Sequence, residues 1–83
     1  MEHTEIYNLI TTFFVERFEI PKEEIKPEAN LFKDLGLDSI DALDMMGMLE
    51  SEIELDVNVD ELKKIRTVQD VVDFVYSKVN ATA

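Results

Sequence analysis

Apolar residues recur at intervals of three and four in three separate segments of this chain, and no segment sustains the alternation of a half-buried strand. This spacing places the apolar side chains of each segment on one face of a helix. The three sets are Ile6, Leu9, Ile10, Phe13 and Phe14; Ala42, Met45, Met46, Leu49 and Ile53; and Val68, Val71, Val72, Val75 and Val79, joined by Phe74. Valine favours strands, but its spacing here is helical, so the pattern predicts an all-α chain.

Two prolines limit the first helix. The spacing predicts a helix over residues 4–18, after which Pro21 and Pro27 interrupt regular structure. Residues 19–38 are therefore expected to form a long loop, with a helical turn that begins at Pro21. The expected apolar anchors of this loop are Leu31, Phe32 and Leu35.

Capping residues predict where the later helices begin. The second helix is expected after Gly36, with Asp38 or Ser39 as its N-cap, and should end near Glu54. A short third helix is expected over residues 60–65.

The fourth helix is expected after Thr67, with Asp70 completing an approximate capping box. The predicted fold is a four-helix bundle with three longer helices, a short third helix and a long first loop. Its 83 residues, 46% of them hydrophobic, suffice for one modest core, so we expect a single domain over residues 1–83.

The residue inventory argues against catalysis. Cysteine is absent, which excludes disulfides, thiolate metal sites and a catalytic thiol. The only histidine, His3, is expected in a frayed terminus. Without a second histidine or a glycine-rich phosphate loop, no nucleophile–base pair can be assembled, so we expect no enzyme. No apolar run reaches membrane-spanning length and the N-terminus lacks signal-peptide features, so we expect a cytoplasmic protein without membrane insertion.

Acidic residues dominate the charge. Nineteen Asp and Glu against eight Lys and Arg give a net charge of −11, which would repel nucleic acid. No Lys or Arg occurs between Asp34 and Leu62, a stretch with ten acidic residues, and this favours docking of a partner with a basic surface. The basic residues lie outside it, at Arg17, Lys22, Lys26, Lys33, Lys63, Lys64, Arg66 and Lys78.

Four of these acids could suggest a metal cluster, namely Asp34, Asp38, Asp41 and Asp44. They lack the Asp-x-Asp-x-Asp-Gly pattern of a calcium loop. Asp41 and Asp44 are also expected to project into solvent, so no dedicated metal site is predicted.

Residues 35–41 read Leu-Gly-Leu-Asp-Ser-Ile-Asp. Ser39 in this segment could simply cap the second helix. Alternatively, it could expose a hydroxyl at the positive end of that helix, where an attached anionic phosphodiester would be favoured. The local residues leave both interpretations open.

Residues 35–41 resemble the attachment motif of acyl carrier proteins, whose core is Asp-Ser followed by an aliphatic residue. Three flanking segments strengthen the resemblance at matching distances: residues 25–34 resemble the family's first loop, 49–53 the acidic end of its second helix, and 65–70 the opening of its last helix. The resemblance covers the chain from about Ile6 to Val79.

The resemblance implies that a phosphopantetheinyl transferase moves 4′-phosphopantetheine from coenzyme A to the oxygen of Ser39, with Asp38 contributing to recognition. The thiol of this arm would carry acyl chains as thioesters in fatty acid or related lipid or polyketide biosynthesis. A chain without cysteine must borrow such a thiol. The family also shelters its acyl chain between helices, which adaptable side chains would allow here; these are Met45, Met46, Met48 and Leu49.

The resemblance implies that partners dock on the second helix, whose acids would meet basic patches on acyl-transfer and chain-elongation enzymes. We also expect a monomer. Carried over by position, the docking residues are Ile40, Asp41, Leu43, Asp44, Gly47 and Glu50. Ile40 stands where leucine is usual, and Gly47 where methionine or another apolar residue is common. Gly47 leaves open a carrier dedicated to a specialised pathway.

Two other functions remain as alternatives. The first is an aminoacyl or D-alanyl carrier of the same fold, distinguished by the ligase that charges its thiol. The second is an unmodified acidic helical adaptor, which would keep its function when Ser39 is replaced by alanine.

Overall fold

The structure is a computed structural model that describes residues 2–81, and within that range it contains four α-helices, one 3₁₀ turn and no strand. The elements are α1 (His3–Phe18), η1 (Lys22–Glu24), α2 (Ser39–Glu52), α3 (Val59–Leu62) and α4 (Val68–Ala81). This confirms the all-α prediction, including the long loop before α2 and the helical turn after Pro21.

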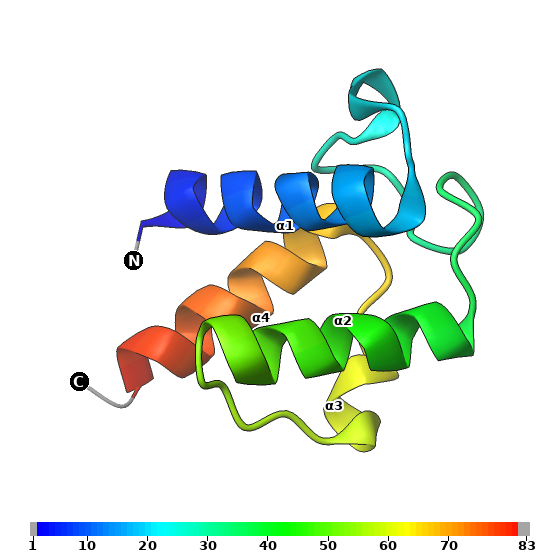
Figure 1. Ribbon diagram of the computed structural model, residues 1–83. Helices are drawn as coiled ribbons and strands as arrows, with labels where there is room; N and C mark the ends of the chain where they lie inside the picture. The colour runs from blue at the N-terminus through cyan, green and yellow to red at the C-terminus, as the bar shows by residue number, and fades with distance from the viewer. Residues whose placement is uncertain (1, 82–83) are drawn as a thin grey trace.

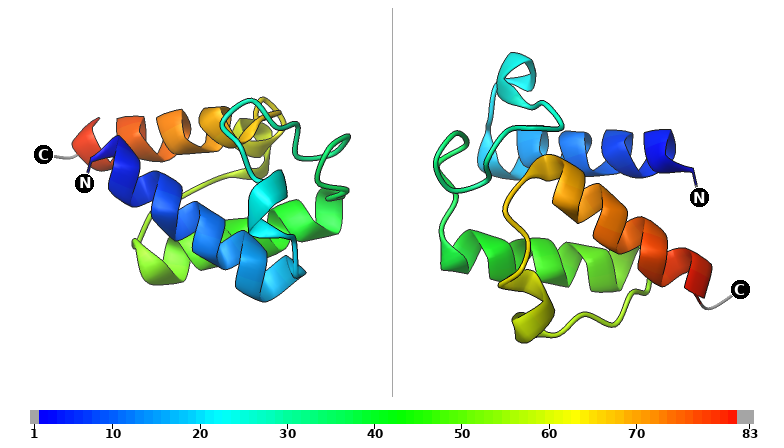
Figure 2. Two further views of the ribbon diagram at one scale, coloured as in Figure 1. Left: turned by 90° about the horizontal axis from the view of Figure 1, so that it is seen from above. Right: turned by 180° about the vertical axis from the view of Figure 1, so that it is seen from behind.

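The longer helices are arranged around a common interior. α1 and α2 run in opposite directions, and α4 crosses behind them (Figure 1). From behind, α4 lies in front of both, and α3 sits beside α2 (Figure 2). The long loop returns from the end of α1 to the start of α2, and an isolated antiparallel bridge between Asn30 and Thr67 ties it to the start of α4.

The core is made by the apolar faces predicted from the spacing. The side chains that are almost completely buried are Ile6, Ile10 and Phe14 of α1, Leu49 of α2, and Val68, Val71, Val72 and Val75 of α4. Burying one such side chain contributes about 1.5–3 kcal/mol. Because the valines gain this burial on one helical face, packing overrides their preference for strands.

Side-chain caps fix the starts of α2 and α4. An Oδ1 atom of Asp38 accepts the backbone N–H groups of Ile40 and Asp41, both at 3.0 Å, so Asp38 is the N-cap of α2 and Ser39 is not. At α4, the N–H of Asp70 donates to Oγ1 of Thr67 and the N–H of Thr67 to Oδ2 of Asp70, each at 3.1 Å. The predicted capping box of α4 is therefore confirmed.

The third helix is shorter and begins earlier than predicted. Asn58 caps it, because its Oδ1 atom accepts the N–H of Glu61 at 2.9 Å. After Leu62 the chain tightens into a turn in which the N–H of Ile65 donates to the carbonyl of Leu62 at 3.1 Å. The predicted range of 60–65 missed Asn58 as the cap.

Two further expectations are wrong. His3 is not frayed: it is the first residue of α1, and its ring stacks on Tyr76 of α4 with centroids 3.8 Å apart. Phe32 does not anchor the loop, since it is 42% exposed while the neighbouring Leu31 is 3% exposed. The N–H of Leu31 donates to the carbonyl of Arg66 at 2.8 Å, so the loop is fixed against the start of α4 where Leu31 is buried.

Candidate functional site

Ser39 occupies the first position of α2, directly after its cap. Its side chain is exposed, and within the described residues its hydroxyl takes part in no hydrogen bond. Asp38 alone satisfies the first N–H groups of the helix. The hydroxyl of Ser39 is therefore free for chemistry without any cost to the cap.

A cavity of about 190 Å³ opens beside Ser39. The long loop, α2 and α3 form its walls, through Phe32, Ser39, Ala42, Leu43, Val59, Leu62 and Lys63. Phe32, Leu43 and Val59 are among the exposed large apolar residues, so an apolar rim surrounds the hydroxyl. Lys63 is the single charged side chain of the lining.

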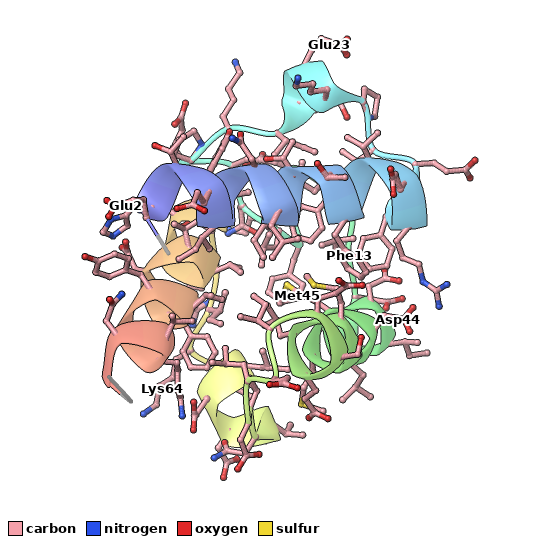
Figure 3. The ribbon with its side chains drawn as sticks, turned by 60° about the vertical axis from the view of Figure 1, so that its left-hand side comes forward. Glu2, Phe13, Glu23, Asp44, Met45 and Lys64 are labelled. Carbon is pink, nitrogen blue, oxygen red and sulfur yellow. The ribbon has the colours of Figure 1, made fainter. Side chains whose placement is uncertain are left out.

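The methionines do not line this cavity. Met45 and Met48 are 3% and 9% exposed and belong to the core, together with Leu49. Figure 3 shows Met45 pointing from α2 into the interior, on the side toward α1. Sequence reasoning missed Phe32 and Val59 as cavity residues. Both are apolar residues that do not belong to a predicted helical face, and this was the signal that could have identified them.

The structure brings the positions expected to dock partners onto one side of α2. Ile40 is 70% exposed and Leu43 is 47% exposed, and Gly47 and Glu50 are also exposed. Residues three and four apart on a helix are neighbours on its surface, so these four form a continuous strip together with Asp44. The strip begins next to Ser39 and is called here the α2 face, defined by Ile40, Leu43, Asp44, Gly47 and Glu50.

Asp41 and Asp44 do not project freely into solvent as expected. Asp41 is half-buried, and its Oδ2 atom accepts the N–H of Asp38 at 3.1 Å in the capping box. Both carboxylate oxygens of Asp44 lie 3.4 Å from Nη2 of Arg17. Figure 3 shows Asp44 on α2 beneath the C-terminal half of α1, which contributes Arg17. Sequence reasoning missed this pair because its members are 27 positions apart.

Residues 2–81 contain no group of three or more histidine or acidic side chains that could hold a metal ion. The carboxylate of Asp34 instead accepts the backbone N–H of Asn30 at 2.7 Å. The same part of the chain has no helix of sufficient length and hydropathy to cross a membrane.

Comparisons with known proteins agree with this geometry. A family model described as "Phosphopantetheine attachment site" matches residues 8–75. The chain is 33% identical over 81 residues to an acyl carrier protein of Thermosynechococcus vestitus (strain NIES-2133 / IAM M-273 / BP-1), covering 98% of this chain and 100% of that protein. It is 37% identical over 65 residues to an acyl carrier protein of Syntrophus aciditrophicus (strain SB), covering 78% of this chain and 81% of that one.

A solved structure is also similar over the whole fold. The crystal structure of an acyl carrier protein from Thermotoga maritima matches with a TM-score of 0.86 and 31% sequence identity. The match covers 100% of this chain and 96% of that chain.

Proposed function

We propose that this chain, which belongs to the acyl carrier protein family, holds its covalent 4′-phosphopantetheine on the oxygen of Ser39. The thiol of this group carries acyl chains as thioesters in fatty acid or related lipid or polyketide biosynthesis. Proteins of this family are carriers and not enzymes. The observation that carries the assignment is the exposed, unbonded hydroxyl of Ser39 beside an apolar cavity. We further propose that residues 1–83 act as one monomeric carrier domain in the cytoplasm.

The surroundings of Ser39 fit the prosthetic group. Its position in the first turn of α2 places a phosphodiester at the positive end of the helix dipole. The N–H groups of Ile40 and Asp41 stay with Asp38, so the dipole and not free N–H groups provides the attraction. The bound group supplies the thiol that this cysteine-free chain lacks. Ser39 has no histidine beside it to act as a general base, because the single histidine, His3, stacks on Tyr76 of α4. Activation of the hydroxyl is therefore left to the transferase.

The cavity favours an acyl cargo over an aminoacyl one. Its lining is apolar except for Ser39 and Lys63. An alkyl chain gains free energy by entering such a space, at about 0.8 kcal/mol for each buried methylene. A charged ammonium group would lose hydration there and would meet the like charge of Lys63.

We assign partner docking to the α2 face. Its exposed apolar side chains, Ile40 and Leu43, lie next to Ser39. Among its acids, Glu50 would steer enzymes with basic patches toward the attached arm, while the charge of Asp44 is compensated by Arg17. These partners include the phosphopantetheinyl transferase and the acyl-transfer and chain-elongation enzymes. Asp38 acts mainly through the cap that presents Ser39.

The test is the intact mass of the purified chain after incubation with coenzyme A, magnesium and a broad-specificity phosphopantetheinyl transferase. The native chain and a Ser51→Ala control, which alters another exposed serine of α2, should each gain one phosphopantetheine. The Ser39→Ala variant should gain none. Loading of Ser39→Ala, or no loading of any chain by a transferase that modifies a known carrier, would favour the unmodified adaptor.

A further inference from the structure

A basic side chain from outside α2 borders the α2 face. Nη2 of Arg17, near the end of α1, lies 3.4 Å from both oxygens of Asp44. The two side chains are 59% and 41% exposed, so the pair lies at the surface where a partner can reach it. The guanidinium therefore compensates the charge of one acid of the face and places a cationic group at the edge of that face.

Arg17 is unusual among the cations of the described residues. The other ion pairs of basic side chains there are Lys63 with Asp60, Lys78 with Glu61, and His3 with Asp73, and none involves α2. Glu50, six residues beyond Asp44 on the same helix, has no ion pair within residues 2–81. The charge on the α2 face is therefore uneven: Arg17 compensates the charge of Asp44, and no basic side chain of the described residues compensates that of Glu50.

We infer that Arg17 is a specificity-determining residue of partner docking, and this inference rests on the proposed role of the α2 face. A suitable partner places a carboxylate opposite Arg17 and basic groups opposite Glu50. A partner with a uniformly basic patch must instead bring like charge against Arg17 or separate it from Asp44, and either event weakens its docking. Arg17 thereby selects against uniformly basic partners.

The experiment measures kcat/KM for loading of Ser39 by a transferase chosen for a uniformly basic docking patch. Removing the cation with Arg17→Gln should raise kcat/KM by about two- to fivefold at low ionic strength, the scale set by an exposed ion pair. Arg17→Glu should raise it further. Both gains should shrink as salt screens the charges.

Lys22→Gln is the matched control, because it removes the same charge from η1, on the far side of α1 from α2 (Figures 1 and 2). It should change kcat/KM by less than Arg17→Gln does. Thermal melting of each variant separates docking from folding, since a purely structural tie between α1 and α2 would lower the melting temperature without raising kcat/KM.

Equal rates for the native chain, Arg17→Gln and Lys22→Gln would overturn this inference while leaving Ser39 as the attachment residue. A lower rate for Arg17→Gln would overturn it as well. Absence of any adduct on Ser39 would instead contradict the proposed function, and this inference with it.

Discussion

Asp38 and Ser39 are adjacent and have separate tasks. The carboxylate of Asp38 holds the first turn of α2 through two backbone N–H groups at 3.0 Å, while the hydroxyl of Ser39 stays free. Either residue is a good cap by type, so the sequence alone could not distinguish them. The structure does so, and it leaves Ser39 available for modification without loss of the helix start.

Replacement of Asp38 should show how much the cap contributes to the free energy of unfolding. Asp38→Ala should lower the free energy of unfolding by about 1 kcal/mol, because two N–H groups lose their acceptor. Asp38→Asn should lose much less, since its amide oxygen can still accept. Urea denaturation measures both, and equal losses for the two variants would show that charge and not capping is what Asp38 contributes.

Gly47 is the residue whose role the sequence left open. It lies exposed within α2, and a Cβ atom built on it has no heavy atom within 4 Å apart from its local helix backbone and neighbours. Gly47→Ala should therefore stabilise the protein by about 0.5–1 kcal/mol through helix propensity alone. Gly36→Ala is the contrasting variant, because Gly36 has a φ of +71° and alanine there should destabilise. A less stable Gly47→Ala variant in thermal melting would contradict this.

At the scale of elements, α3 depends on contacts from outside itself. It spans only Val59–Leu62, too short to be stable alone. Nζ of Lys78 in α4 lies 2.9 Å from Oε2 of Glu61, and Oε1 of Glu61 also accepts from Asn58 at 3.0 Å. The ion pair is half-buried, so it holds α3 against α4 and sets one wall of the cavity beside Ser39.

Loss of this ion pair should loosen α3 selectively. In Lys78→Gln, amide hydrogen exchange should become several-fold faster at Leu62 and Lys63, whose N–H groups bind the carbonyls of Asn58 and Val59. Exchange in the interior of α1 should change little. Uniform acceleration across all helices would mean that Lys78 stabilises the whole fold and not α3.

The sequence predicted those elements whose determinants are local. The C-terminal end of α1 and the capping box of α4 follow from spacing and caps within a few residues, and the structure confirms both. The outward Phe32 and the Arg17–Asp44 pair depend on contacts between distant segments, so no local pattern contained them. The start of α3 did have a local signal, because its cap Asn58 lies three positions before Glu61, and the prediction overlooked it. The cavity beside Ser39 was missed because its lining combines the long loop, α2 and α3. The hypothesis that the core methionines make room for an acyl chain stays a prediction.

For the whole molecule, the excess of acid is the dominant electrostatic feature. The net charge is −11 on 83 residues, and few of the acids have a basic partner among the described residues. Self-repulsion of this size works against a compact state and is screened by salt. Under the proposed docking, the same field would steer basic partners toward α2, at a cost in stability.

Added salt should therefore stabilise the fold. The melting temperature should rise between about 10 mM and 150 mM ionic strength, as the screening length falls from about 30 Å to 8 Å. Magnesium should raise it further at equal ionic strength, because a divalent cation associates more strongly with dense carboxylates. A melting temperature independent of both salt and magnesium would show that repulsion does not limit stability.

The central claim is that Ser39 carries an acyl thioester on a phosphopantetheine arm. The most direct measurement is tandem mass spectrometry of the peptide containing Ser39 after loading with an acyl-coenzyme A and a phosphopantetheinyl transferase, with and without hydroxylamine. The account predicts one acyl-phosphopantetheine on Ser39, and loss of only the acyl group in hydroxylamine. An adduct on Ser51 or Ser77, or an unmodified Ser39 beside a carrier that the same transferase loads, would contradict it.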